Sequence, residues 1–556
     1  MPSCLPMSSR GPQAVARLSR TRDARHDSQH LLLGQRGVGD LGPTFRARYF
    51  SLVAQTERDI DDPRERAARF LRQARDYQLG DLPTESRHPL TGDLADLSRH
   101  DLPRALQLLK QIDCSCLETV LRKSAGVAAL ASRMHGCLDR GRRVFIYGCG
   151  ASGRLSLSLE YLWRLVHRGS DAVRGFMSGG DLALVHSIES FEDHPEYGAR
   201  QVAESGFQPD DLFVGCTEGG ETPSVIGATE AAAAVSRPFF LYCNPDDALS
   251  KVTRSWRVLE NPSIDKLNLY VGPMTLAGST RLQASTALML AAGAALFRVD
   301  PTPLLEFLDR LDTGFLIPFI EEEAAIYARG EYVLYETSHY GITILTDTTE
   351  RAPTFSLPGF ENLQDPQRRP SPSYLCMSEA ADGASAWRDI LLREPITLEW
   401  EELVPVPGRQ RLSGFDFSRN ARAHRQALLG GIRQHVFLIE RRGPRLEMQL
   451  GTHRAGVEVS SLHPLFEHLL LKMLLNMHST LLMGRLGRYE SNLMTWVRPS
   501  NMKLVDRAIR YVAYLLARDG IRVSYEEIAY RCFEKIEELA PDQSIVLETV
   551  AALRGS

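Results

Sequence analysis

Cysteine is scarce in this sequence and has no metal-binding spacing. The 556 residues include nine cysteines, an odd number, scattered along the chain without a Cys-x-x-Cys pair. Cys114 and Cys116 are too close in sequence for ordinary bridging. This usage argues against a disulfide-stapled scaffold and against a structural zinc site. We therefore expect a reducing compartment, a cytoplasmic protein and no bound metal.

Long uninterrupted apolar runs and an excess of one charge are also lacking. The richest apolar stretch, 469–486, is interrupted by Lys472, Asn476, His478 and Arg485. A membrane span needs about 20 apolar residues, so we expect a buried amphipathic helix here and no membrane partner. The chain has 65 basic and 69 acidic residues and a net charge of −4. This balance provides no general attraction to nucleic acid, and none is expected as a partner.

The length and the start of the chain set the domain expectations. A chain of 556 residues is too long for one ordinary core, and its 43% apolar content is enough for more than one. Residues 1–44 carry several arginines with little periodicity. They suit a transit peptide, or a disordered tail or misplaced start codon, which we favour. Residues 45–115 predict a helical N-terminal extension.

Short apolar runs then alternate with helical patterns. Alternation of this kind predicts an α/β fold, in which a parallel sheet has helices on both faces. After about residue 301 the pattern restarts in a degenerate second copy, and the tail after 485 is mostly helical. The proline-rich stretch 353–373 is expected to wander. The predicted strands are 144–147, 173–177, 212–216, 238–243, 332–335 and 435–440, and the clearest helices are 155–165, 222–234, 304–329, 507–518 and 525–539.

The stretch 144–154 is the most informative in the chain. It reads Val-Phe-Ile-Tyr-Gly-Cys-Gly-Ala-Ser-Gly-Arg, so an apolar run ends in a glycine-rich turn that brings Ser152 to the start of a helix. Glycines let backbone N–H groups approach a ligand, and a helix N-terminus attracts anions. The stretch therefore predicts a phosphate cradle. A tight strand-to-helix turn without a ligand is the local alternative.

The same glycines match the dinucleotide fingerprint Gly-x-Gly-x-x-Gly. Such a site also needs an acid at the end of the second strand to bind the ribose. Asp171 has about the right spacing, but it precedes the strand candidate 173–177. We therefore expect no nucleotide and no other cofactor.

Four further loops follow the predicted strands of the first copy. They are 178–181 with Glu192 beyond it, 215–223, 243–245 and 272–281. Glu192 could bind a ligand or be a solvated helix charge. Thr217 could bind phosphate or cap a helix. Glu218 and Glu221 would repel phosphate, so we expect them to point away or to bind amine or hydroxyl groups.

In this order the segments resemble the sugar isomerase (SIS) domain family, in the branch that holds N-acetylmuramic acid 6-phosphate etherases and glucokinase regulatory proteins. The resemblance spans about 83–510. It begins at Thr84-Glu85-Ser86, includes the loops above and resumes at 475–480, 487–488, 492–494 and 501–504. In the etherase pattern the block that ends at Arg281 leads almost directly into the block at Leu475. Here a second domain's length of chain separates them, as in the regulatory proteins.

The resemblance implies two flavodoxin-like SIS domains, each a three-layer αβα arrangement with a parallel sheet. They would span 116–305 and 306–485, under a helical C-terminal lid at 486–556. Lys503 would neutralise the phosphate, although Lys503 and Arg507 at i, i+4 could also be a surface pair. The implied sugar-phosphate site is Ala151, Ser152, Glu192, Thr217, Glu218, Gly219, Glu350, Lys503 and Arg507.

The first functional expectation is a regulator that binds a hexose phosphate such as fructose 6-phosphate or fructose 1-phosphate, with a sugar kinase as partner. The alternative is an N-acetylmuramic acid 6-phosphate etherase, a lyase that releases D-lactate and uses Glu192 as a catalytic carboxylate. The second family glutamate falls on Leu162, and Glu160 lies about 200° away on an ideal helix. Met274 and Gln283 also depart from the etherase pattern. An aldose–ketose isomerase is a third alternative, without an evident His/Glu pair.

Overall fold

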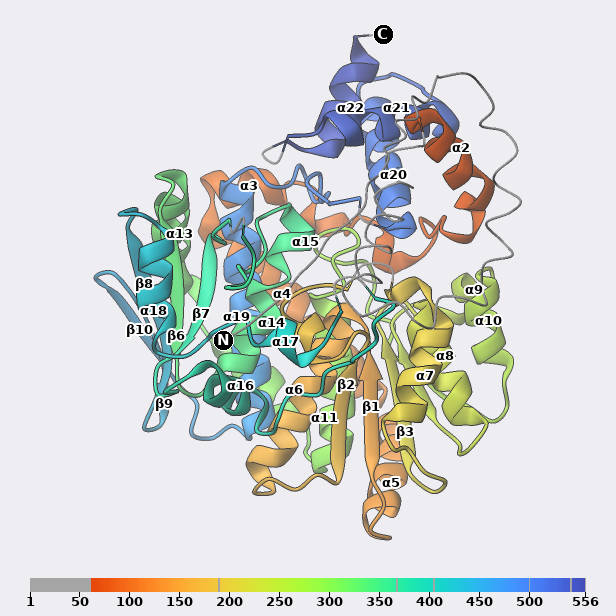
Figure 1. Ribbon diagram of the computed structural model, residues 1–556, viewed down its shortest axis with the longest axis vertical. Helices are drawn as coiled ribbons and strands as arrows, with labels where there is room; N and C mark the ends of the chain where they lie inside the picture. The colour runs from red at the N-terminus through yellow and green to blue at the C-terminus, as the bar shows by residue number, and fades with distance from the viewer. Residues whose placement is uncertain are drawn as a thin grey trace, which may run out of the picture. The chain divides into compact units, whose positions relative to one another are not determined.

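The computed structural model describes residues 62–188, 191–366, 369–403, 406–499, 501–540 and 543–555. All of them belong to one unit, Ile60–Ser556. The predicted tail at 1–44 and the first part of the helical extension, 45–61, lie outside the described residues. Two five-stranded sheets, each with helices packed against it, make up the described chain (Figure 1).

The first sheet is parallel throughout, with the order β2-β1-β3-β4-β5. This order is that of flavodoxin-like folds, as predicted. Four of its strands were predicted from their apolar runs. The fifth was missed, because its sequence Asp-Lys-Leu-Asn has a single apolar residue. The strands are β1 Val144–Gly148, β2 Val173–Met177, β3 Leu212–Thr217, β4 Phe239–Tyr242 and β5 Asp265–Asn268.

Alternate residues of these strands are buried against different helices. In β1, Val144 and Ile146 face one apolar core, and Phe145 and Tyr147 face the other. This is the period of two expected of a strand covered on both sides. One face is covered by α5 Ser124–Leu138, α6 Gly150–Val166 and α11 Gln283–Phe297, and the other by α7 Pro195–Glu204, α8 Pro223–Ala233 and α10 Thr253–Glu260.

The second sheet is mixed, with the order β10-β9-β8-β6-β7. Strands β7, β6 and β8 are parallel, whereas β9 and β10 run antiparallel. The expectation of a parallel second sheet is therefore wrong at this edge. The turn at Gly443-Pro444 joins β8 to β9 and is far too short for a parallel crossover. The strands are β6 Tyr332–Thr337, β7 Ser373–Met377, β8 Gln434–Arg442, β9 Arg445–Leu450 and β10 His453–Glu458.

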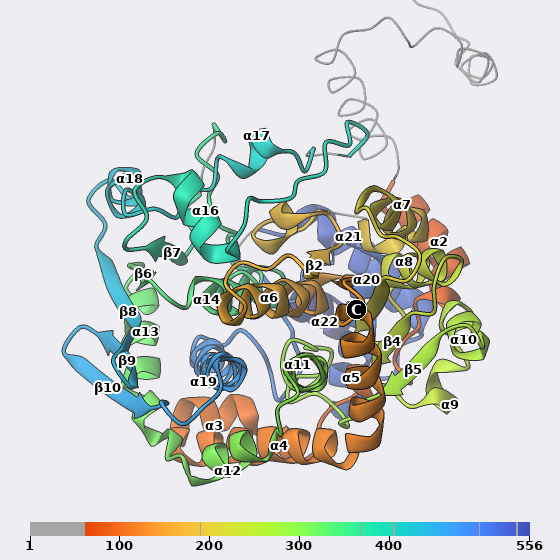
Figure 2. The same cartoon turned by 90° about the horizontal axis from the view of Figure 1, so that it is seen from below.

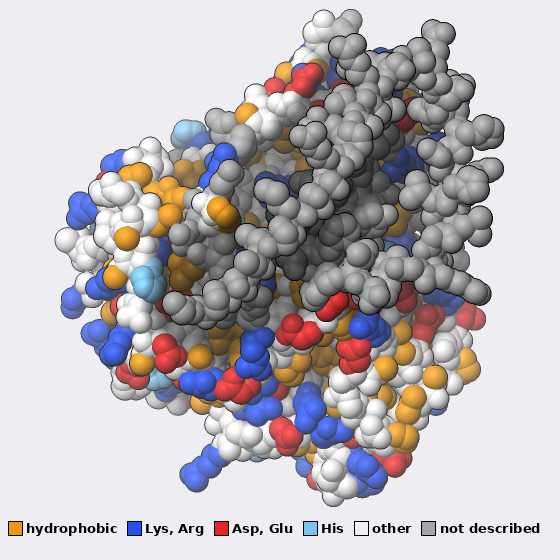
Figure 3. Space-filling model, in the orientation of Figure 1, with side chains coloured by type: hydrophobic (Ala, Val, Ile, Leu, Met, Phe, Trp, Pro, Cys, Tyr) orange, Lys and Arg blue, Asp and Glu red, His pale blue; other side chains and the backbone are white. Residues whose placement is uncertain are grey.

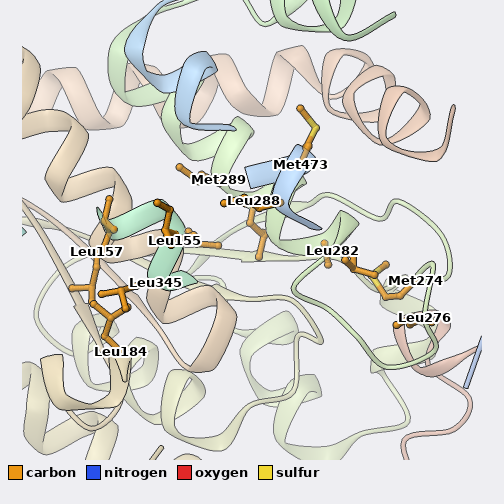
Figure 4. Packing of buried hydrophobic residues seen from close by; sticks show 14 of the residues in the cluster. Leu155, Leu157, Leu184, Met274, Leu276, Leu282, Leu288, Met289, Leu345 and Met473 are labelled. Atoms are coloured by element: carbon orange, nitrogen blue, oxygen red, sulfur yellow. The ribbon is translucent and has the colours of Figure 1, made fainter. Parts of the chain in front are cut away.

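Helix α19, Pro464–Arg485, lies between the two halves (Figure 2). It packs against α11 on one side and against α13, Ile317–Ala328, and α14, Gly341–Thr348, on the other. The predicted buried helix at 469–486 is thus confirmed, and it is buried around nearly its whole circumference. Met473 lies close to Leu288 and Met289 of α11 in this core (Figure 4).

The helices at the two ends of the described chain pack together (Figure 1). Helix α2, Pro63–Gln73, contacts α21, Tyr525–Glu538, and both α21 and α22, Ile545–Arg554, contact α20, Met502–Arg518. The predicted helices at 507–518 and 525–539 are confirmed. The other helices are α3 Leu94–His100, α4 Leu102–Arg122, α9 Asp246–Leu249, α12 Thr302–Arg310, α15 Arg351–Phe355, α16 Gly383–Leu391, α17 Arg409–Leu412 and α18 Ala421–Leu428.

The described part of the face seen in Figure 3 is of mixed charge. Acidic and basic side chains are interspersed over the described part of the face in Figure 3. Among the described helices, none combines the length and the apolar character that a bilayer crossing requires.

A buried ionic network joins the two halves. Arg351 is 1% exposed and donates to Glu323 of α13 and to Asp347 of α14, each at 3.0 Å. The other oxygen of Asp347 accepts from Arg281 at 3.0 Å and from Ser479 of α19 at 2.7 Å. Because buried charges are tolerated only when they are paired, each member depends on the others.

Replacing Arg351 by methionine should leave Glu323 and Asp347 buried without their shared cation. We expect the free energy of unfolding to fall by about 3–5 kcal/mol, measured by urea denaturation at pH 7. The control is Arg388→Met, whose pair with Glu394 is half-exposed and should change stability by less than about 0.5 kcal/mol. Equal effects of the two substitutions would contradict a structural role for the network.

Candidate functional site

A crevice lies beyond the carboxyl ends of the first sheet's strands. Its cavity has a volume of about 230 Å³. The strand order reverses between β1 and β3, and open α/β sheets bind ligands at such a point. The lining comes from the turn after β1, the turn at Phe191–Asp193, the loop after β3, segment 278–281, the start of α15 and the first turns of α20.

The turn after β1 is tight, and glycine is required in it. A Cβ at Gly148 would lie 2.4 Å from the Ser152 backbone, and Gly150 has φ +55°. The Ser152 hydroxyl accepts from the Cys149 N–H at 3.2 Å and donates to the Cys149 carbonyl at 2.8 Å. Gly150 and Ala151 line the crevice, but Ser152 is not among the lining residues. Its hydroxyl closes the turn, which is the local alternative considered above.

Thr217 behaves in the same way. Its hydroxyl is hydrogen-bonded to the Thr222 hydroxyl at 3.0 Å and accepts from the Gly220 N–H at 3.2 Å. It is fully buried and closes the loop after β3. The next two residues, Glu218 and Gly219, do line the crevice.

The two predicted cations of α20 both line the crevice, and both are paired. Lys503 donates to Glu221 at 2.6 Å, so Glu221 binds an amine, one of the roles expected for it. Arg507 donates to both oxygens of Glu85, at 2.9 and 2.7 Å. The side chains of Lys503 and Arg507 are 19% and 7% exposed, so they are not a surface pair. Glu85 was missed as a site residue, since its partner is 422 positions away in the sequence.

Glu350 brings the second half of the chain into the crevice. It precedes α15 and pairs with Arg154 of α6 at 2.6 Å, and both residues line the cavity. Arg154 belongs to the predicted cradle but was given no role. Its position directly after Gly153, within the glycine-rich turn, was the sequence signal that could have suggested a role.

Glu192 and Glu218 differ from the other lining carboxyl groups. Among the described residues, neither forms an ion pair with a lysine or arginine. The Glu192 carboxylate accepts a long contact of 3.8 Å from the Cys149 thiol. Oε1 of Glu218 is buried and has no hydrogen-bond partner in the described part of the chain. Burial raises the pKa of Glu218 to about 8. These two carboxyl groups are therefore the ones free to meet a ligand.

The three positions that depart from the etherase pattern lie behind the lining. Leu162 is 1% exposed in the apolar core. Glu160 accepts from Arg164 at 3.1 Å and from Arg393 at 2.9 Å, so it does not take the place of a carboxylate at 162. Gln283 is hydrogen-bonded to Thr275, and Met274 is fully buried.

Residues 127–233 match the family model described as "Glucokinase regulatory protein N-terminal SIS domain". N-acetylmuramic acid 6-phosphate etherases are similar to part of the chain. The one from Synechococcus elongatus is 35% identical over 209 residues, 37% of this chain and 64% of that protein. The one from Synechocystis is 33% identical over 218 residues, 38% of this chain and 67% of that protein. The chain belongs to the SIS-domain family.

These matches leave much of each protein uncovered. This SIS-domain chain spans just under two thirds of the length of the Synechococcus relative, and the aligned part is little more than a third of its own length. Among solved structures, a tagatose-6-phosphate ketose/aldose isomerase from Escherichia coli has a TM-score of 0.33 and 12% identity, over 49% of this chain and 67% of that one.

The ion pairs of Glu221 should make the stability of the folded protein depend on pH in the acid range. Burial alone would raise the pKa of Glu221, but Lys503 and Arg254 outweigh it and lower the pKa to about 2. In the unfolded chain the pKa of a glutamate is about 4.3. The stabilisation of the fold by the ion pairs of Glu221 is therefore complete above pH ~5, and it is lost as the pH falls through the pKa of Glu221 in the folded protein.

Glu221→Gln should lower the free energy of unfolding by about 3 kcal/mol at pH 7. The difference from the native chain should shrink between pH 5 and pH 2, followed by urea denaturation. The matched control is Glu230→Gln on α8, where the half-exposed carboxylate pairs with exposed Arg257. A difference that does not depend on pH would count against this electrostatic explanation.

Proposed function

We propose that the crevice binds a hexose phosphate. The first turn of α6 supports this, because Gly150 and Ala151 belong to a helix N-terminus that borders the cavity, where N–H groups and the helix dipole favour an anion. Lys503 reaches the same cavity on a flexible stem. On binding, the Lys503 ammonium would leave Glu221 and pair with the phosphate, because a phosphate carries more negative charge than a carboxylate.

For the reaction we propose cleavage of the lactyl ether of N-acetylmuramic acid 6-phosphate. The observation that carries it is Glu192, which lines the cavity, forms no ion pair with a lysine or arginine of the described residues, and so is available as a base. In the ring-opened sugar the proton on carbon 2 is acidified by the neighbouring aldehyde. Its transfer to Glu192 would allow the bond between carbon 3 and the lactyl oxygen to break. The relatives named above support this choice of substrate.

A hexose-phosphate-dependent regulator with a sugar kinase partner is the second candidate. It is favoured by Leu162, which removes one of the two carboxylates that the etherase resemblance implies. Glu350 and Lys503 come from the second half and from the C-terminal helices, so one ligand would touch three parts of the chain. Such a ligand would shift the equilibrium between open and closed forms if it bound them unequally.

Lactate release distinguishes the etherase from the regulator. Purified protein incubated with N-acetylmuramic acid 6-phosphate should release lactate, and Glu192→Gln should reduce the rate by at least about 100-fold because the base is lost. Glu230→Gln should retain the rate. A native chain that releases no lactate, yet is stabilised by fructose 6-phosphate or fructose 1-phosphate in a thermal-shift assay, would replace the lyase by the regulator.

Phosphate binding has its own test. Lys503→Ala should weaken stabilisation by hexose phosphates, with a loss of about 10- to 150-fold in affinity for a charge-assisted hydrogen bond worth ~1.5–3 kcal/mol. The control is Lys535→Ala on α21, where the ammonium pairs with an exposed carboxylate outside the crevice. Unchanged affinity in Lys503→Ala, by titration calorimetry, would remove this residue from the site.

A further inference from the structure

The proposed elimination needs a proton donor as well as a base. When the bond between carbon 3 and oxygen breaks, the electron pair stays on the departing oxygen, and an unprotonated alkoxide is a poor leaving group. A positioned acid normally supplies the proton. The position that the etherase resemblance gives to a second glutamate is Leu162, inside the apolar core, so the donor must lie elsewhere.

Most carboxyl groups of the crevice are already committed. Glu85 is held by Arg507 and Arg510, Glu221 by Lys503 and Arg254, and Glu350 by Arg154. A carboxylate in a buried ion pair stays ionised and has no proton to give. Among the described lining residues, this leaves Glu192 and Glu218.

Glu218 and Glu192 both line the crevice. Both carboxyl groups lie near the Cys149 thiol, whose pKa is raised by burial and then by the two of them. Glu218 itself is 6% exposed, and its Oε1 has no hydrogen-bond partner among the described residues. A buried oxygen without a partner costs free energy unless something occupies the adjacent space. A ligand oxygen would satisfy it.

We propose that Glu218 is the catalytic acid that protonates the departing lactyl oxygen, while Glu192 removes the proton from carbon 2. This assignment rests on the proposed lyase function. In the step, Glu192 takes the proton, the electron pair of that C–H bond forms the double bond between carbons 2 and 3, and the pair of the C–O bond goes to oxygen. Glu218 gives its proton to that oxygen. The products are lactate and an unsaturated aldehyde phosphate, and no oxidant or reductant is needed.

The surroundings of Glu218 favour its protonated form. Burial raises its pKa to about 8, and the charge of Glu350 acts in the same direction. Its own backbone N–H, the Ser152 hydroxyl and Lys503 oppose this effect without cancelling it. At pH 7 the acid therefore holds its proton in the cavity that Glu192 also lines, and elimination requires such a pair of acid and base.

Two measurements on isosteric variants separate acid from base. The first is lactate release from N-acetylmuramic acid 6-phosphate. The second is exchange of the carbon-2 proton of N-acetylglucosamine 6-phosphate in D₂O, followed by NMR, which needs the base but no leaving group. Glu218→Gln should release lactate about 100-fold or more slowly than the native chain, whereas its rate of proton exchange should stay within a few-fold of the native rate. Glu192→Gln should lose both, and Glu230→Gln should lose neither.

The pH profile gives a third readout. Lactate release by the native chain should fall as the pH rises through about 8, since Glu218 then loses its proton. The residual activity of Glu218→Gln should lack this fall, because an amide does not titrate there. Thermal unfolding of each variant verifies that it is folded.

The outcomes separate the two proposals. If the native chain releases no lactate, the lyase function fails, and the role of Glu218 fails with it. If the native chain releases lactate and Glu218→Gln retains the rate, only the assignment of Glu218 is overturned. The assignment is also overturned if folded Glu218→Gln loses proton exchange together with lactate release.

Discussion

The shared carboxylate of Asp347 is the interaction on which the rest of the structure depends. It accepts from Arg281 next to the first sheet, from Arg351 of the second half and from Ser479 of α19. Guanidinium groups do not lose their protons in proteins, so two buried arginines require buried carboxylates. The same contacts hold both sides of the crevice. Segment 278–281 ends at Arg281, and Glu350 immediately precedes Arg351, so the position of the lining follows from that of the network.

Within the crevice the charges are matched in a way that distinguishes two groups of carboxylates. Glu85, Glu221 and Glu350 each neutralise a cation that lines the crevice, namely Arg507, Lys503 and Arg154. This pairing neutralises the buried cations without a ligand, and the proposed phosphate would have to compete with these carboxylates. Glu192 and Glu218 have no such partner in the part of the chain that the structure describes, and both lie near the Cys149 thiol. The crevice therefore combines a region suited to an anion with a region suited to proton transfer.

Much of the first half could be predicted from the sequence, because its signals are local. The apolar run and glycines at 144–154 predict strand, turn and helix, since a side chain at Gly148 would clash with the Ser152 backbone and Gly150 has a positive φ, which glycine favours. The second half was harder. Strand β7 lies at the end of a proline-rich stretch, and β10, with the sequence His-Arg-Ala-Gly-Val-Glu, lacks a regular alternation of apolar and polar residues. Seven of the nine residues expected at the sugar-phosphate site line the cavity. Ser152 and Thr217 use their hydroxyls to close their own turns.

By itself the sequence determined the strand-turn-helix unit, the spacing that puts Lys503 and Arg507 on one face of a helix, and the absence of a carboxylate at position 162. These depend on neighbours within a few residues. Only the tertiary structure decided which carboxylate each cation meets. Arg507 and Glu85 are 422 positions apart, and Arg154 and Glu350 come from different halves. It also decided that Glu218 pairs with none of the described cations, because burial and long-range pairing depend on how distant segments pack, and no local pattern encodes them.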